Sequence, residues 1–273
     1  MCQRLPILRL LKRKRFQPAT LACVSFSRLV QPTSLLLKPK MLKNKNLVQY
    51  LALGFKEVEG WCGEQVFTTL DLLDSLDINK IGGCLEIGIH HGQSYMLLNQ
   101  VIDAGATSYA VDIFDNQEMN IDQSGVGSLA IFKSNLEKYD VHKGANTVSI
   151  VGDSTDPSLK LEEIVGVGSM RFISIDGGHT PEHTVSDLNL ACRLVNNQGV
   201  VILDDVLHHH WPGVMEGVGR FLHGYPTLVP FALGHNKLYL CKISYQAYYV
   251  EAFSKCSLAT RPVVFYGHRI IAL

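Results

Sequence analysis

From residue 81 to residue 242 the sequence alternates short apolar segments with longer amphipathic ones, and no other feature constrains the fold as strongly. The apolar segments that read as strands are residues 84–89, 108–114, 147–151, 171–175, 200–203, 228–233 and 238–241. The segments that read as helices are residues 94–102, 127–139, 180–195 and 213–221. Strands that alternate with helices form a parallel sheet with right-handed crossovers. We therefore predict an α/β fold: a doubly wound, Rossmann-like, mostly parallel sheet of seven strands.

The last two predicted strands are joined by a short turn, Gly234-His235-Asn236-Lys237. Such a sequence favours a hairpin, and a hairpin makes its two strands antiparallel. We therefore expect an antiparallel last strand, which the sheet of an ordinary dinucleotide-binding dehydrogenase does not need.

The flanking sequence suggests three parts. Residues 46–78 show helical spacing of apolar side chains with a break at Gly60 and Trp61, so we predict two short helices there. They are assigned to the main domain, residues 46–242. Residues 243–273 are predicted to be a C-terminal extension, with a helix over 245–254 and a strand over 263–265.

The N-terminal segment, residues 1–45, is rich in Lys and Arg and has no Asp or Glu. Its composition resembles an organelle transit peptide. A disordered basic tail, or a true start at Met41, explains the same composition. We expect a cytoplasmic or organellar protein, not a secreted one.

Overall charge and cysteine usage exclude several classes of protein. The formal net charge is zero, so the chain has no electrostatic bias toward nucleic acid, and we expect no nucleic-acid partner. The seven cysteines are irregularly spaced without a CxxC pair, which argues against a disulfide framework or a structural zinc site. No apolar run reaches the roughly 20 residues of a membrane span, so none is expected.

The first predicted strand leads into a glycine-containing turn, Glu86-Ile-Gly88-Ile-His-His-Gly92-Gln-Ser94. Glycine lets the backbone bend sharply and approach a ligand, and the following helix offers its N-terminal N–H groups. The pattern is not G-x-G-x-x-G, so the pyrophosphate fingerprint is absent. On its own, the turn also fits an ordinary connection between a strand and a helix.

Acidic residues follow the next two strands. Asp112 ends the second strand, where an acid can accept hydrogen bonds from both ribose hydroxyls of a nucleoside. Gly152-Asp153-Ser154 follows the third strand as a polar turn suited to an adenine edge. Each could be a plain capping residue, but their order on successive strand ends is unlikely to arise by chance.

Three further carboxylates follow the fourth and fifth strands: Asp176, Asp204 and Asp205. The ends of adjacent strands meet, and unpaired like charges so close are unfavourable. A hard divalent cation such as Mg²⁺, Ca²⁺ or Mn²⁺ would resolve the conflict through oxygen ligands. The alternative is that one Asp caps a helix and another pairs with Lys or Arg.

Together these motifs resemble those of the metal-dependent class I O-methyltransferases that use S-adenosylmethionine (SAM), over roughly residues 60–242. The closer likeness is to the subgroup with the macrocin and macrolide-sugar O-methyltransferases and the cephalosporin-hydroxylase-like proteins. The resemblance rests on the glycine turn, Asp112, Gly152-Asp153-Ser154, Ile175-Asp176-Gly-x-His179 and Asp204-Asp205. Catechol-type relatives often have Asn at the last position, so Asp205 is a mild departure.

The resemblance implies a role for each of these residues. It places Glu86, Gly88, Gly92 and Ser94 along the methionine part of SAM, Asp112 at its ribose, and Asp153 and Ser154 at its adenine. It makes Asp176, Asp204 and Asp205 ligands of a divalent metal, with Mg²⁺ as the expected ion, and His179 a catalytic base. The implied reaction is methyl transfer to a hydroxyl of a small molecule, a sugar or natural product, by a possible homo-oligomer.

Other histidines and other functions stay open. His183 lies one helical turn beyond His179 and reads as a surface or capping residue. The run His208-His209-His210 follows the Asp pair and, with Asp204, could supply the two His and one carboxylate of a non-heme iron hydroxylase. An NAD-dependent oxidoreductase on a similar sheet and a binding module without catalytic activity are the remaining alternatives.

Overall fold

The sheet has nine strands in a computed structural model that describes residues 42–78 and 80–273. In spatial order they are β3 (Thr147–Val151), β2 (Ser108–Asp112), β1 (Gly83–Ile87), β4 (Met170–Ile175), β5 (Val195–Leu203), β7 (Lys237–Lys242), β6 (Leu228–Gly234), β9 (His268–Ala272) and β8 (Arg261–Phe265). The strands β1 to β5 are parallel, and β7 runs antiparallel to both β5 and β6. The predicted α/β fold and its antiparallel closing strand are confirmed.

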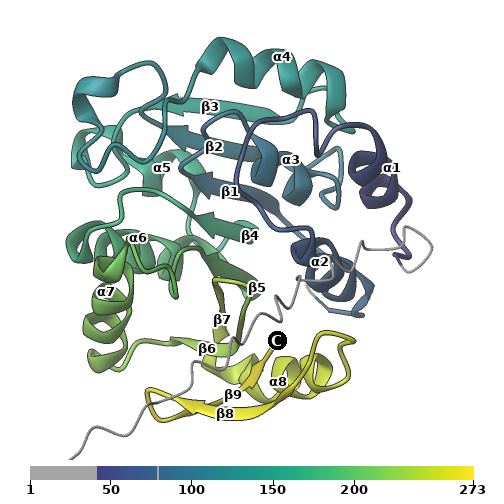
Figure 1. The fold of residues 1–273 in the computed structure, drawn as a ribbon, viewed down its shortest axis with the longest axis vertical. Helices are drawn as coiled ribbons and strands as arrows, with labels where there is room; N and C mark the ends of the chain where they lie inside the picture. The colour runs from purple at the N-terminus through teal and green to yellow at the C-terminus, as the bar shows by residue number, and fades with distance from the viewer. Residues whose placement is uncertain (1–41, 79) are drawn as a thin grey trace, which may run out of the picture. The chain divides into compact units, whose positions relative to one another are not determined.

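The predicted number of seven strands is wrong, because a C-terminal hairpin adds β8 and β9. Strand β9 pairs in parallel with β6, and β8 then forms the edge of the sheet (Figure 1). The hairpin turn is Tyr266-Gly267, and both residues have positive φ angles of 45° and 81°. A tyrosine in that conformation is uncommon, so the sequence carries only half of the usual turn signal.

Helices cover both faces of the sheet. One face carries α1 (Lys45–Leu53), α2 (Gln65–Ser75), α3 (Gln93–Asn99), α4 (Leu129–Tyr139) and α8 (Gln246–Ser254). The other carries α5 (Leu161–Val165), α6 (Pro181–Leu194) and α7 (Pro212–His223). Short 3₁₀ turns, η2 (Gln117–Met119), η3 (Pro157–Leu159) and η4 (Ile243–Tyr245), lie in the connections.

Alternating strand side chains supply the two cores. Ile202 of β5 packs into the core beneath α1–α4 and α8, and the adjacent Leu203 packs into the core beneath α5–α7. Residues of the predicted C-terminal extension belong to the first core, because Tyr249, Phe253 and Ile271 are all buried there. Burying such a side chain contributes about 1.5–3 kcal/mol.

The register brings the ends of the central strands level with one another. Ile87 of β1 lies beside Ile175 of β4, and Ile175 lies beside Leu203 of β5. The residues that follow these strands therefore meet at a single edge of the sheet, where open α/β sheets bind their ligands.

The predicted N-terminal targeting segment lies outside the described residues up to position 41. Within the described part of the chain, every helix is too short or too polar to cross a membrane.

Candidate active site

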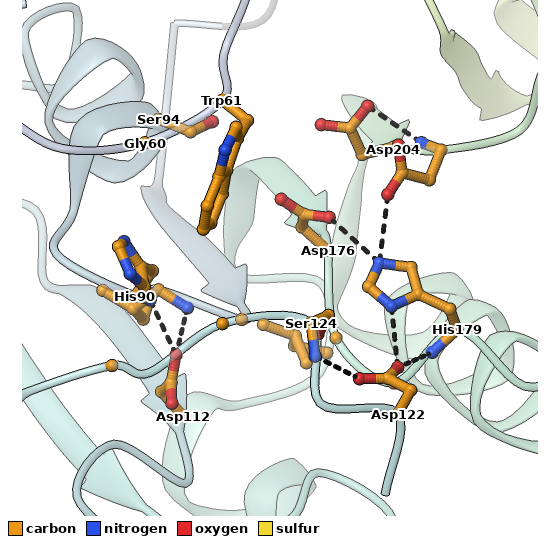
Figure 2. A pocket seen from close by; sticks show the side chains of 18 of the residues that line it. Gly60, Trp61, His90, Ser94, Asp112, Asp122, Ser124, Asp176, His179 and Asp204 are labelled. Atoms are coloured by element: carbon orange, nitrogen blue, oxygen red, sulfur yellow. Dashed lines mark hydrogen bonds and ion pairs between the residues drawn. The ribbon is translucent and has the colours of Figure 1, made fainter. Parts of the chain in front are cut away.

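A cavity of about 470 Å³ opens at the carboxyl ends of β1, β2, β4 and β5 (Figure 2). Its volume is within the range of roughly 300–1,000 Å³ that is typical of small-molecule sites. Most residues predicted from the sequence line it: Gly88, Ser94, Asp112, Asp153, Ser154, Asp176, His179, Asp204 and Asp205. Glu86 and Gly92 are not part of the lining.

The glycine turn lies tightly against the loop that follows β4. Gly88 has a φ of 84°, and a β-carbon there would lie 1.9 Å from the carbonyl oxygen of Asp176. Gly92 has a φ of 91° and begins α3, where a β-carbon would lie 2.5 Å from the ring of Phe132. Both positions therefore require glycine, the first for the pocket wall and the second for the packing of α4.

Asp112 fixes the glycine turn to the end of β2. Its carboxylate accepts hydrogen bonds from the backbone N–H groups of Ile89 and His90, the latter at 2.8 Å, and from Phe114 N–H at 2.5 Å. Figure 2 shows the carboxylate below His90 at the wall of the pocket. Asp112 thus anchors the glycine turn at the pocket wall, and its contact with a ribose stays a prediction.

Glu86 lies behind the pocket wall. It is 1% exposed, and its carboxylate oxygens approach the hydroxyls of Ser94 and Ser174 without forming a hydrogen bond. Burial raises the pKa of Glu86 to about 8, because desolvation penalises the charged form. The raised pKa favours the neutral, protonated form of Glu86 at neutral pH.

The free energy of unfolding of the Glu86→Gln variant should depend less on pH than that of wild type. When folding raises the pKa of a carboxyl group, the folded protein is destabilised as the pH rises. The loss begins above the pKa that the group has in the unfolded chain and continues up to its pKa in the folded protein. Between pH 6 and pH 8 wild type should lose on the order of 2 kcal/mol relative to the variant. Urea denaturation at both pH values measures this difference, with the exposed Glu137→Gln as the control. Equal pH dependence of wild type and Glu86→Gln would contradict the assignment.

Asp153 and Ser154 form the wall beyond β3. The Asp153 carboxylate accepts hydrogen bonds from the N–H and hydroxyl of Thr155, both at 2.8 Å, and lies 3.5 Å from His183 Nε2. Burial opposes its charge, but these partners outweigh burial and lower the pKa of Asp153. His183 itself lines the pocket from the first turn of α6, which Thr180 caps.

His179 stands at the centre of an acidic cluster. Its Nδ1 lies 2.7 Å from Asp122 Oδ2, and its Nε2 lies 3.1 Å from Asp205 Oδ2 and 3.8 Å from Asp176 Oδ1 (Figure 2). Its ring stacks on Trp211 with centroids 4.4 Å apart. Burial opposes the charge of His179, but the hydrogen-bonded carboxylates of Asp122, Asp176 and Asp205 raise its pKa to about 11.

This environment bears on the predicted role of His179 as a base. A general base needs a neutral imidazole with a nitrogen free to accept a proton. Both ring nitrogens face carboxylates here, and the raised pKa keeps the ring protonated near neutral pH unless another cation occupies the cluster. The base role stays a prediction.

Asp204 has a different environment from Asp176 and Asp205. Its carboxylate contacts the ammonium of Lys237, which is buried, and also accepts the N–H of Asp205 at 2.8 Å. Burial lowers the pKa of Lys237, but Asp204 more than compensates and holds it above the ordinary range. The ion pair is therefore formed at neutral pH.

The ligand atoms of Asp176, His179 and Asp205 all lie within 4.8 Å of one another, and Asp204 is not in this group. A second such group among the described residues is Glu59, His90 and His91 at the pocket mouth. The indole of Trp61, which is 73% exposed, lies beside the ring of His90 with centroids 4.9 Å apart.

Sequence reasoning missed Asp122 and Lys237. Asp122 lies in the connection between β2 and α4, where no periodic pattern indicates its position. Lys237 was treated only as part of a hairpin turn. The antiparallel pairing of β5 with β7 could have indicated its partner, since Leu203 pairs with Leu238 and the residues beyond them, Asp204 and Lys237, must then be neighbours.

Comparisons with known proteins agree with this arrangement. Residues 85–206 match a family described as a methyltransferase domain. An O-methyltransferase of Bacillus cereus, solved in complex with SAH, superposes with a TM-score of 0.52 at 18% identity, over 76% of this chain and 92% of that one. Cofactor-bound Rv0187 from MTB superposes with a TM-score of 0.50 at 19% identity, over 68% of this chain and 84% of that one.

The chain therefore has the fold of these solved proteins, and its residues 85–206 match the methyltransferase-domain family, in agreement with the class indicated by its motifs. A curated relative, an uncharacterized protein, R132, of Acanthamoeba polyphaga mimivirus, is 29% identical over 91 residues. That match spans 33% of this chain and 41% of the relative.

Proposed function

We propose that this protein transfers a methyl group from SAM to a hydroxyl oxygen of a small molecule, a sugar or natural product, with the help of a divalent cation. The observation that carries the proposal is the convergence of the glycine turn, Asp112 and the Asp176–His179–Asp205 cluster on one cavity of a methyltransferase domain. A nucleoside site and an acidic site adjoin there within reach of a single bound substrate.

The chain fits SAM through its pocket walls. Gly88 lets the turn that lines the pocket lie against the Asp176 carbonyl, and Ser94 lines the pocket at the start of α3. Asp112, Asp153 and Ser154 also line the pocket, and we propose that Asp112 accepts hydrogen bonds from the ribose while Asp153 and Ser154 border the adenine. SAM supplies a methyl group that its sulfonium already activates, so the protein has to place an acceptor oxygen in line with that carbon.

A divalent cation fits the acidic side of the pocket. The Nε2 atom of His179 lies 3.1 Å from Asp205 Oδ2 and 3.8 Å from Asp176 Oδ1, and the ligand atoms of these three residues lie within 4.8 Å of one another. Asp176, Asp204 and Asp205 remain the ligands proposed from the sequence, with Mg²⁺ as the expected ion. A bound cation would lower the pKa of an acceptor hydroxyl and orient it. Asp122 and Trp211 then keep the imidazole of His179 in place beside the acceptor.

Aromatic side chains supply the remaining surface for an acceptor. Four aromatic side chains line the pocket: Trp61, Trp211, His208 and His210. Such walls suit the apolar face of a sugar ring or a planar natural product, with polar groups left to fix its hydroxyls. The partner proposed for this protein is therefore a small molecule.

The test is SAM binding by calorimetry. Asp112→Asn should weaken SAM binding by tenfold to a hundredfold, because a hydrogen bond to a charged group contributes about 1.5–3 kcal/mol. The control is Asp115→Asn, whose carboxylate accepts the N–H of Leu129 at 3.1 Å outside the pocket. NAD should not bind. Binding of NAD without binding of SAM would reject the proposal in favour of an oxidoreductase.

The iron hydroxylase alternative receives less support from the geometry. That chemistry needs two His and one carboxylate on one face of the metal. The cluster at the centre of the pocket has one His and two carboxylates, and the Asp204 of the alternative set is paired with Lys237. The group of Glu59, His90 and His91 does have two His and one carboxylate, but its Glu59 side chain is 70% exposed.

A further inference from the structure

We infer that Glu59, His90 and His91 form a binding site for a transition-metal ion at the mouth of the pocket, with Zn²⁺ as the expected ion. Each of the three residues offers one ligand atom, and these atoms all lie within 4.8 Å of one another. His90 lies apart from His179 and its carboxylates (Figure 2), so this site is separate from the acidic cluster. The inference goes beyond the proposed function and does not depend on it.

The glycine turn brings the two imidazoles together. Successive residues of an extended chain point their side chains in opposite directions, yet the ring centroids of His90 and His91 are only 3.9 Å apart. The backbone of His90 is left-handed, with a φ of 52°, which bends the chain between the two residues. Such a conformation is uncommon for histidine, and positions of this kind cluster at functional sites. The carboxylate of Asp112 holds the bend by accepting the N–H of His90 at 2.8 Å.

Glu59 supplies the third ligand. Its Oε2 lies 3.3 Å from Nδ1 of His91, whose side chain is 9% exposed. Around a tetrahedral Zn²⁺ ion with bonds of about 2.0–2.2 Å, neighbouring ligand atoms are about 3.3–3.6 Å apart. This carboxylate and this imidazole are therefore already at the separation that two ligands of one ion require. The Glu59 side chain is 70% exposed, so the fourth position of the ion would be open to water.

The segment that carries Glu59 is held on both sides by Gln93. The Gln93 side chain donates a hydrogen bond to the carbonyl of Val58 at 3.0 Å and accepts the N–H of Cys62 at 2.9 Å. Gln93 follows His91 by two residues, so the carboxylate and the imidazoles belong to one hydrogen-bonded unit. The backbone around all three ligands is thus ordered before an ion binds, which lowers the entropic cost of binding.

The donor set determines the class of ion. Imidazole suits Zn²⁺, Cu²⁺, Ni²⁺ and iron, whereas Mg²⁺ and Ca²⁺ prefer sites made of oxygen. Two imidazoles and one carboxylate at the pocket mouth therefore select a different ion from the carboxylates of the acidic cluster. Zn²⁺ is the probe for the experiments because it has no redox chemistry of its own.

Zinc titrations of the full chain in excess Mg²⁺ test the site. They use a His179→Gln background, in which the acidic cluster has no imidazole and its oxygens are left to Mg²⁺. Adding Glu59→Gln should weaken Zn²⁺ binding by at least about tenfold, since even loss of an outer-shell partner costs that much at other metal sites. Glu57→Gln, at an exposed position of the same connection, is the matched control and should keep the affinity. Equal Zn²⁺ affinity with and without Glu59→Gln would overturn the inference.

X-ray absorption at the zinc edge counts the imidazole ligands of the wild-type chain loaded with one equivalent of Zn²⁺. The spectrum should show two imidazoles, and His90→Asn should lose one of them. Asparagine tolerates the left-handed conformation, so this variant keeps the turn. A single imidazole in wild type would place the ion at His179 and refute the site at the pocket mouth, as would a spectrum that His90→Asn leaves unchanged.

An ion at this site would also tie the segment that carries Glu59 to the glycine turn. Zn²⁺ should therefore raise the Tm of the wild-type protein more than that of Glu59→Gln, because the ion binds the folded chain of wild type more tightly. An equal rise in both proteins would count against the site.

SAM calorimetry on zinc-free protein separates this inference from the proposed function. SAM binding by a protein whose zinc spectrum lacks two imidazoles would refute the metal site and leave the methyltransferase proposal standing. Coordination by two imidazoles without SAM binding would do the reverse.

Discussion

Gly88→Ala should destabilise the protein by about 3 kcal/mol or more and weaken SAM binding at least tenfold. The φ of 84° is unfavourable for any residue with a β-carbon, and that atom would lie 1.9 Å from the Asp176 carbonyl oxygen. The clash cannot be relieved by a side-chain rotation, because the atom it meets belongs to the backbone. The turn and the loop after β4 must therefore move apart, and the two halves of the pocket move with them.

Thermal unfolding and SAM calorimetry measure the two effects of Gly88→Ala. A loss of 3 kcal/mol corresponds to a fall in Tm of roughly 10 °C for a domain of this size. Gly105→Ala is the control, since a β-carbon at position 105 would meet nothing within 4 Å. A Gly88→Ala protein with the Tm and SAM affinity of wild type would show that the turn does not approach Asp176 as described.

Lys237→Met should cost about 3–5 kcal/mol of stability, because it leaves the buried carboxylate of Asp204 without its partner. The methionine replaces the aliphatic part of the lysine, so the loss comes mainly from the unpaired charge. Asp176 and Asp205 lie nearby and add repulsion to it. Urea denaturation at pH 7 gives the free energy of unfolding directly.

The double variant Asp204→Asn/Lys237→Met shows whether charge is the cause. Replacing both members of a buried ion pair by neutral residues is often close to neutral in stability. Most of the loss seen in Lys237→Met should therefore be recovered. Lys133→Met, an exposed position of α4, should have almost no effect. Equal instability of the single and double variants would point to lost packing instead.

The parallel strands and the polar edge of the sheet could be predicted because they depend on local patterns. Each apolar run is short enough to be a buried strand, and parallel strands place the residues that follow them at one edge. Asp112, Asp176 and Asp204 were located in this way, and the structure places all three around one cavity. The sheet was expected to have seven strands, without β8 and β9, because the Tyr266-Gly267 turn that joins these two strands carries only a weak sequence signal for a hairpin.

Contacts between distant segments could not be predicted from those patterns. Asp122 meets His179 across 57 positions of sequence, through a connection whose path depends on tertiary packing. The position of Glu86 behind the pocket wall has the same origin, since a strand residue can face the ligand or the core. The sequence indicated which residue types gather at the site, but not how their charges are paired.

The C-terminal hairpin also determines which strand of the sheet is exposed to other chains. Without β9, the apolar strand β6 would offer its free main-chain groups to any neighbouring molecule, which is a common start of aggregation. With the hairpin in place, the outermost strand is β8, which begins with Arg261-Pro262, and a charged residue and a proline both discourage further strand addition. Residues 261–273 thus cover the edge of an apolar strand and leave an edge that begins with a charged residue and a proline.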